Sequence, residues 1–188
     1  MRKGWTTTKL IATGSLGVLG ALIFIPFLVL ARVLQMPGLF VMTSAFLIPS
    51  ILVPGLFIIN QFGAAAIGVT VLVILTLPMG FVGPPGFLPG VLLGPTVGGM
   101  IDILYFFLKK KEKLAAYVIA IGAIFIQEVF YISLLRLFSI PGWDKSLKLL
   151  ISPLGIGFIL FHGLLGGTIG YIVLKKIRKT AVVKRIQQ

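Results

Sequence analysis

The sequence is dominated by long apolar runs that are separated by short polar or glycine- and proline-containing turns. An α-helix needs about 20 mainly apolar residues to cross a bilayer, whereas a membrane β-strand alternates over about 10. The 188-residue chain is 58% hydrophobic and 11% charged, with a mean hydropathy of +1.13. Soluble domains carry about 25% charged residues. We therefore predict an all-α integral membrane protein, one domain over residues 1–188, with six transmembrane helices at about residues 10–34, 38–59, 64–80, 91–108, 114–138 and 149–174.

The distribution of basic residues predicts how this bundle is oriented. Six crossings put both termini on one side of the membrane. Most of the 17 lysines and arginines then fall on that side, and those expected on the other side are Arg32, Arg136, Lys145 and Lys148. Because cytoplasmic loops carry the excess of positive charge, we expect a multi-pass protein of the cell membrane with cytoplasmic N- and C-termini. The basic tail and the cluster at Lys109–Lys113 suit lipid headgroups, a cytoplasmic partner or simply a solvated edge. No nucleic acid is expected.

One stretch, Gly80 to Asp102, interrupts the membrane-like pattern with prolines and glycines. Proline removes a backbone donor and restricts the residue before it, so this stretch resists regular helix. We predict a water-facing outer turn at Gly80–Gly90, a candidate gate, that leads into a fourth helix. Asp102 falls in the cytoplasmic half of that helix. It is interpreted either as a helix anchor near Lys109 or Lys110 or as a relay in coupling.

The residue inventory argues against several kinds of chemistry. The chain has no cysteine and one histidine, His162, which excludes disulfides, thiolate metal sites and multi-histidine zinc sites. It also lacks a nucleophile elbow, paired acids at a useful spacing and an H-E-x-x-H pattern. We therefore expect no metal, no cofactor and no enzymatic activity.

A few ionisable and aromatic residues are candidates for binding a small solute. Polar groups at membrane depth are costly and usually face protein or water. Arg32, Glu128 and Arg136 are expected near the outer opening. The six candidate substrate-binding residues are Arg32, Glu128, Arg136, Tyr131, Trp143 and His162. Alternatively, Glu128 pairs with an arginine only to fasten helices, and His162 makes a helix–helix hydrogen bond.

The first predicted helix carries small residues at four-residue spacing, namely Thr13, Gly17 and Ala21. Small side chains allow a second helix to approach closely. That second helix belongs either to a partner protein or to the chain's own bundle, and the spacing does not distinguish the two.

Taken together, these features resemble the substrate-binding S component of energy-coupling factor (ECF) vitamin transporters. The resemblance lies in six short helices, basic cytoplasmic termini and the small residues of the first helix. The order of features is most similar to the thiamine-precursor (hydroxymethylpyrimidine) type, through Gly83-Pro84-Pro85-Gly86, then Gly98 to Asp102, then the Lys109 cluster.

The resemblance implies a subunit that captures a small water-soluble vitamin or precursor from outside. It also implies partners: a transmembrane coupling subunit, which docks on Thr13, Gly17 and Ala21, and ATPase subunits. Two other functions stay open, which are a self-contained small transporter or channel, and a membrane scaffold or assembly protein without a small ligand.

Overall fold

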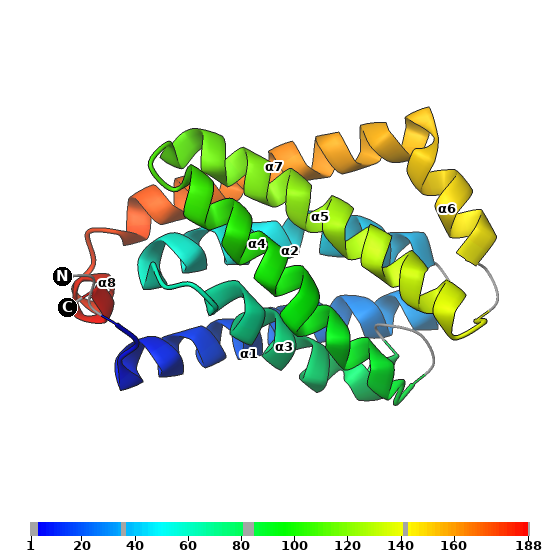
Figure 1. Ribbon diagram of the computed structural model, residues 1–188, viewed down its shortest axis with the longest axis horizontal. Coiled ribbons are helices and arrows are strands. Elements are labelled where there is room, and N and C mark those ends of the chain that lie inside the picture. Colours follow the sequence, from blue (N-terminus) through cyan, green and yellow to red (C-terminus); the bar gives the residue numbers. More distant parts are fainter. Residues whose placement is uncertain (1–3, 35–36, 81–84, 141–142, 188) are drawn as a thin grey trace.

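The computed structural model describes residues 4–34, 37–80, 85–140 and 143–187, and every regular element within them is a helix (Figure 1). An all-α fold is therefore confirmed. The α-helices are α1 (Thr7–Val33), α2 (Pro37–Ile59), α3 (Ala64–Thr76), α4 (Leu93–Leu108), α5 (Glu112–Leu137), α6 (Trp143–Ile151), α7 (Pro153–Ile177) and α8 (Ala181–Gln187). Two short 3-10 helices, η1 (Leu77–Met79) and η2 (Leu88–Leu92), flank the glycine- and proline-rich loop.

Four helical segments of the described chain are long and apolar enough to cross a membrane: Thr7–Ala31, Leu88–Leu108, Glu112–Leu137 and Pro153–Ile177. Two further apolar helical segments, Ala45–Ile59 and Ala64–Met79, are shorter. Large apolar side chains also cover the outside of the bundle, as in Leu22, Phe107 and Leu154, which are 64%, 77% and 75% exposed. An apolar exterior of this kind is solvated by lipid rather than water, so the chain is a membrane protein.

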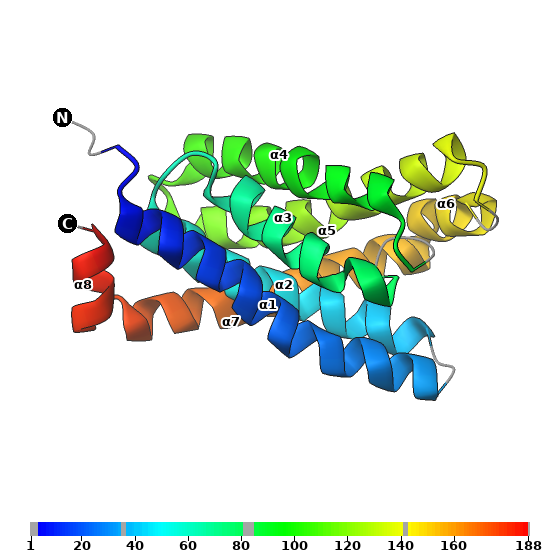
Figure 2. The same ribbon diagram turned by 90° about the horizontal axis from the view of Figure 1, so that it is seen from below.

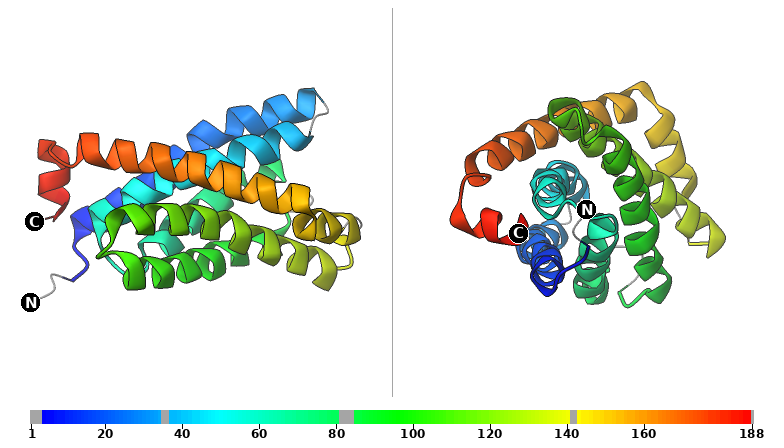
Figure 3. Two further views of the ribbon diagram at one scale, coloured as in Figure 1. Left: turned by 90° about the horizontal axis from the view of Figure 1, so that it is seen from above. Right: turned by 60° about the vertical axis from the view of Figure 1, so that its left-hand side comes forward.

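The long helices form a closed ring. Going round it, α1 packs against α3, α3 against α4, α4 against α5, α5 against α7, α7 against α2, and α2 against α1. α2 also touches α5 across the ring. Figures 1 and 2 show both chain ends and α8 at one end of the bundle, with α6 at the other. The right-hand view of Figure 3 is oblique and brings the end that carries the chain termini forward. We call the end that carries the chain termini the terminal end.

The last part of the chain differs from the prediction. A single helix was expected from residue 149 after a polar loop at residues 139–148, but α6 begins at Trp143 and α7 begins at Pro153. The reason is a helix start signal inside the apolar run. The Ser152 hydroxyl accepts a hydrogen bond from the Gly155 N–H at 3.1 Å, and Pro153 occupies the first turn, which is the favoured chemistry of a helix N-terminus. The basic tail also forms a helix, α8, which buries Val183.

α3 and α4 approach closely because α4 presents glycines to α3. A Cβ atom at Gly98 would lie 2.5 Å from Cα of Ala66, and one at Gly94 would overlap Thr70. One turn beyond Gly98, Asp102 is fully buried. Its carboxylate accepts hydrogen bonds from the backbone N–H groups of Ala65 and Ala66, both at 3.0 Å. Asp102 therefore caps α3 from the neighbouring helix.

This cap explains how a short helix can begin inside an apolar bundle. The N-cap position of α3 is Gly63, which has a φ of 93° and no side chain to offer. The first N–H groups of a helix need acceptors, and the helix dipole favours negative charge there. The anchor interpretation of Asp102 is thus the one that describes its contacts, although it anchors α3 and not the region of Lys109 or Lys110.

α7 packs closely between α2 and α5 because it, too, presents glycines to its neighbours, here on two sides. Cβ atoms at Gly163 and Gly167 would lie 2.6 Å from Ile121 and 3.0 Å from Tyr117 of α5. On the other side, Cβ atoms at Gly166 and Gly170 would lie 2.9 Å from the carbonyl of Phe46 and 3.0 Å from Val53 of α2. The close approach of three backbones compensates for the weak hydrophobic drive between helices in lipid.

Candidate functional site

The polar centre inside the ring is formed by Gln127 and Glu128 on α5. Glu128 lines a cavity of about 10 Å³ between α5 and α2, whose other walls include Ala45, Pro49 and Ile124. Gln127 lines this cavity and a neighbouring one of about 30 Å³, which reaches α3 and α4. These volumes hold about one or two water molecules. The site is therefore a narrow polar seam where α2 and α5 meet across the ring.

Glu128 has no protein counter-charge in the described part of the chain, where neither a hydrogen bond nor an ion pair involves its carboxylate. Arg136, two turns along α5, is exposed and does not pair with it. Of the two pairs in the helix-fastening alternative, Glu128–Arg136 is therefore not formed, and Glu128–Arg32 stays a prediction. Tyr131 lies one turn from Glu128 on the same side of α5 and packs on the core. The side chains of Arg32 and Trp143 lie outside the described residues.

His162 makes its contacts within its own helix. Its Nδ1 lies 3.0 Å from the carbonyl oxygen of Phe158, and its ring lies 3.9 Å from that of Phe158 between centroids. It is 8% exposed and is not among the residues that line the Glu128 cavity. The expected helix–helix hydrogen bond is thus replaced by a bond to the preceding turn of α7. The structure does not bring His162 to the seam.

The three small residues of α1 are inside the bundle. Thr13 and Ala21 are 0% and 1% exposed, and a Cβ atom at Gly17 would lie 2.5 Å from the carbonyl of Gly68 on α3. The Thr13 hydroxyl donates to the carbonyl of Lys9 at 2.7 Å. The assignment of this face to a partner helix is therefore wrong, because α3 already occupies it. Small residues at four-residue spacing indicate that a helix packs on this face, but they do not identify which helix.

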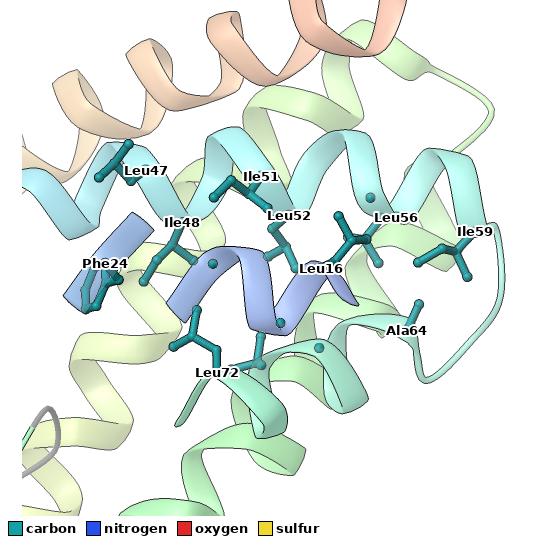
Figure 4. Close-up of a pocket in the computed structure, with 15 residues that line it drawn as sticks. Leu16, Phe24, Leu47, Ile48, Ile51, Leu52, Leu56, Ile59, Ala64 and Leu72 are labelled. Atoms are coloured by element: carbon teal, nitrogen blue, oxygen red, sulfur yellow. The ribbon is translucent and has the colours of Figure 1, made fainter. Parts of the chain in front are cut away.

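Another hollow, shown in Figure 4, lies between α1, α2 and α3 and measures about 40 Å³. Its walls are apolar side chains and glycines, including Leu16, Phe24, Leu52 and Leu72. It offers a solute no charge and no side-chain hydrogen bond. It is packing space beside α1 and not a candidate for recognising a polar molecule.

The sequence reasoning missed a polar cluster at the terminal end, where several helix ends meet. Asn60, in the turn after α2, accepts hydrogen bonds at its Oδ1 from the Tyr105 hydroxyl at 3.0 Å and from Lys109 Nζ at 3.3 Å. Nearby, Arg178 and Glu112 form an ion pair at 2.7 Å, and this bond raises the pKa of the Arg178 guanidinium. The sequence did offer one indication of this cluster, because the predicted topology placed these helix ends on the same side of the membrane.

Within the described residues, no group of three or more histidine or acidic side chains is placed to hold a metal ion. The predicted gate at Gly80–Gly90 includes residues 81–84, which lie outside the described part, so the gate stays a prediction. Comparison of the chain with protein-family models, with curated proteins and with solved structures gave no match.

Proposed function

We propose that this chain is the membrane-embedded, solute-capturing subunit of an uptake transporter, similar to the S component of an ECF vitamin transporter. The observation that carries the proposal is Glu128, an acid inside a membrane bundle with no protein counter-charge among the described residues. Ionisable groups at membrane depth are expensive and usually mark a pathway or a binding site. A cationic or hydrogen-bond-donating solute would supply the missing partner.

The proposed solute is a small water-soluble vitamin or precursor that binds at the seam beside Gln127 and Glu128. The cavities at the seam have room only for groups of the size of one or two water molecules, so binding requires α2 and α5 to separate. Pro49, which lines the seam, and Pro54 lie within α2. Each proline removes a backbone hydrogen bond from its helix, so in this proposal α2 is the helix that bends away from α5.

In the proposed membrane arrangement, α2 and the α3–η1 segment cross together with the four longer helices. The terminal end faces the cytoplasm, because it carries the larger share of lysine and arginine. The coupling subunit and its ATPases would then approach the exposed face of α1. Ile11, Val18 and Leu22 on that face are 63%, 41% and 64% exposed. Those residues replace Thr13, Gly17 and Ala21 as the docking candidates.

The proposal is tested by thermal unfolding of the purified protein in detergent against a panel of vitamins and their precursors. A solute at about 100 times its Kd adds about 2.7 kcal/mol of stability, so one member of the panel should raise Tm clearly. Glu128→Gln should remove that shift. Asp144→Asn, which changes an exposed acid on α6, should retain it.

Three outcomes would redirect the proposal. A shift that survives Glu128→Gln would place the solute elsewhere. If the wild-type protein responds to no solute in the panel, the capture function is wrong and the scaffold role takes its place. If the purified protein alone carries the bound solute into liposomes without ATPase subunits, it is a self-contained transporter.

A further inference from the structure

The polar cluster at the terminal end surrounds a cleft of about 410 Å³ that is separate from the Glu128 seam. Its lining comes from four stretches of the chain that are distant in sequence. These contribute Lys9 of α1, Asn60 after α2, the group Tyr105, Lys109 and Glu112 around the α4–α5 turn, and Arg178 with Gln187 at the C-terminal end. The cleft is therefore a product of the tertiary fold. It also has room for a group larger than a few waters, in contrast to the interior cavities.

The charges around the cleft do not balance. Three cations, Lys9, Lys109 and Arg178, face a single acid, Glu112. Glu112 is already engaged, since Arg178 binds both of its oxygens, at 2.7 and 3.1 Å. Because Glu112 is paired with Arg178, the charges of Lys9 and Lys109 are not neutralised. A concave surface with excess positive charge raises the local concentration of anions.

Lys9 is the cation of the cleft with the fewest protein contacts. Only 4% of the residue is exposed, and among the described residues its ammonium group has no hydrogen-bond acceptor and no ion-pair partner. No unpaired side-chain nitrogen of the described residues is itself buried, so the aliphatic stem of Lys9 is packed while its ammonium group reaches the cleft. An anion bound in the cleft would supply the partner that the protein does not.

Lys109 and the neutral groups are already held in place. Lys109 Nζ donates to Asn60 and lies 5.7 and 5.2 Å from the ring centroids of Tyr105 and Phe106. Asn60 has a φ of 47°, a left-handed conformation that asparagine tolerates better than most residues. Gln187 of α8 donates to the carbonyl of Ile58 at 3.4 Å, which holds α8 against one side of the cleft. Preorganised donors of this kind lower the entropic cost of binding.

We propose that this cleft binds a phosphate group. Two uncompensated lysines match the charge of a phosphate monoester dianion, and lysine and arginine are the usual phosphate-binding side chains. The group is carried either by an anionic lipid headgroup or by a soluble phosphate, because both present the same oxygens. This site does not depend on the solute-capturing function proposed above.

The test measures binding of dioctanoyl phosphatidic acid to the purified protein in a neutral detergent, by native mass spectrometry and by thermal unfolding. Lys9→Met and Lys109→Met remove a charge from the cleft and keep most of the side-chain length. Each should weaken binding at least tenfold. Lys113→Met and Lys179→Met are the matched controls, because both lysines are exposed and neither lines the cleft. They should stay within about twofold of the wild type.

Three further arms make the result specific. Glu112→Gln removes the one acid, so it should tighten binding severalfold. Dioctanoyl phosphatidylcholine, whose headgroup is neutral overall, should bind at least tenfold more weakly than phosphatidic acid. Inorganic phosphate that displaces the lipid at millimolar concentration assigns the site to soluble phosphates, whereas lack of displacement assigns it to a lipid headgroup.

The proposal is overturned if phosphatidic acid does not bind at all, or if Lys113→Met weakens its binding as much as Lys9→Met does. The second outcome would mean a general attraction to a basic surface. If Lys9→Met does not fold, Lys109→Met decides the question, since Lys109 lies at the rim and is only half-buried.

Discussion

The Asp102 carboxylate of α4 accepts the backbone N–H of Ala65, the second residue of α3, at 3.0 Å. With the equivalent bond from Ala66, this contact ties the start of one helix to the interior of the next. We expect Asp102→Asn to destabilise the protein by about 1–3 kcal/mol, because the amide keeps only one acceptor oxygen and leaves a buried N–H group unsatisfied. Denaturant unfolding in mixed micelles measures the effect. Asp144→Asn is the matched control, and equal stability of the two variants would contradict the capping role.

The glycines of α4 give a test with an adjacent control. A Cβ atom at Gly98 would lie 2.5 Å from Cα of Ala66, whereas one at Gly99 would meet nothing within 4 Å. Gly98→Ala should therefore cost about 1–3 kcal/mol through overpacking. Gly99→Ala should be neutral or stabilise by up to about 1 kcal/mol, because alanine favours helix more than glycine does. Thermal unfolding of both variants checks this, and the close packing of α3 on α4 is wrong if they behave alike.

Gly17 and Gly14 test whether the small residues of α1 serve the chain itself. Gly17→Leu places a side chain against the Gly68 carbonyl and Val71, while a Cβ atom at Gly14 meets nothing within 4 Å. We expect Gly17→Leu to unfold at a clearly lower temperature in the purified, isolated protein, and Gly14→Leu to match the wild type. An isolated Gly17→Leu protein of normal stability that fails only to assemble with partners would restore the docking assignment.

His162 is expected to matter as a packed ring and not as a ligand contact. His162→Phe keeps the aromatic contacts with Phe158 and Phe161 and loses one hydrogen bond within α7. It should change stability by no more than about 1.5 kcal/mol and leave the affinity for any solute found in the vitamin screen unchanged. His162→Ala should cost more, through the lost packing. Isothermal titration of His162→Phe settles the matter, since a large loss of affinity would return His162 to the binding site.

Apolar patterns in the sequence specify where the long helices lie but leave open how those helices pack. Runs of apolar residues placed the long helices to within a few residues at most ends, because length and hydropathy are local properties. The start of α7 was misplaced since the Ser152-Pro153 signal lies inside an apolar run. The buried state of Thr13 could not be predicted, because helical periodicity shows that a face is covered but not by which helix.

The same limit applies to the candidate site. Glu128 could be selected from sequence because an acid inside an apolar run is unusual. That Glu128 lacks an arginine partner among the described residues required the structure, as did the cluster that joins Lys9, Asn60 and Arg178. Those three residues are far apart in the chain, and only the closure of the helix ring brings them to one cleft.

The two glycine faces of α7 also determine how this sequence is free to diverge. Gly163, Gly167, Gly166 and Gly170 admit almost no larger side chain, whereas Phe161, Leu164 and Ile172 on the lipid side are 62%, 49% and 48% exposed and can be exchanged among apolar residues at little cost. Over long divergence, such exchange erases overall identity while the small positions and the acid that caps α3 are retained. Distant relatives of this chain should therefore be recognised by the spacing of those positions rather than by the identity of their apolar residues.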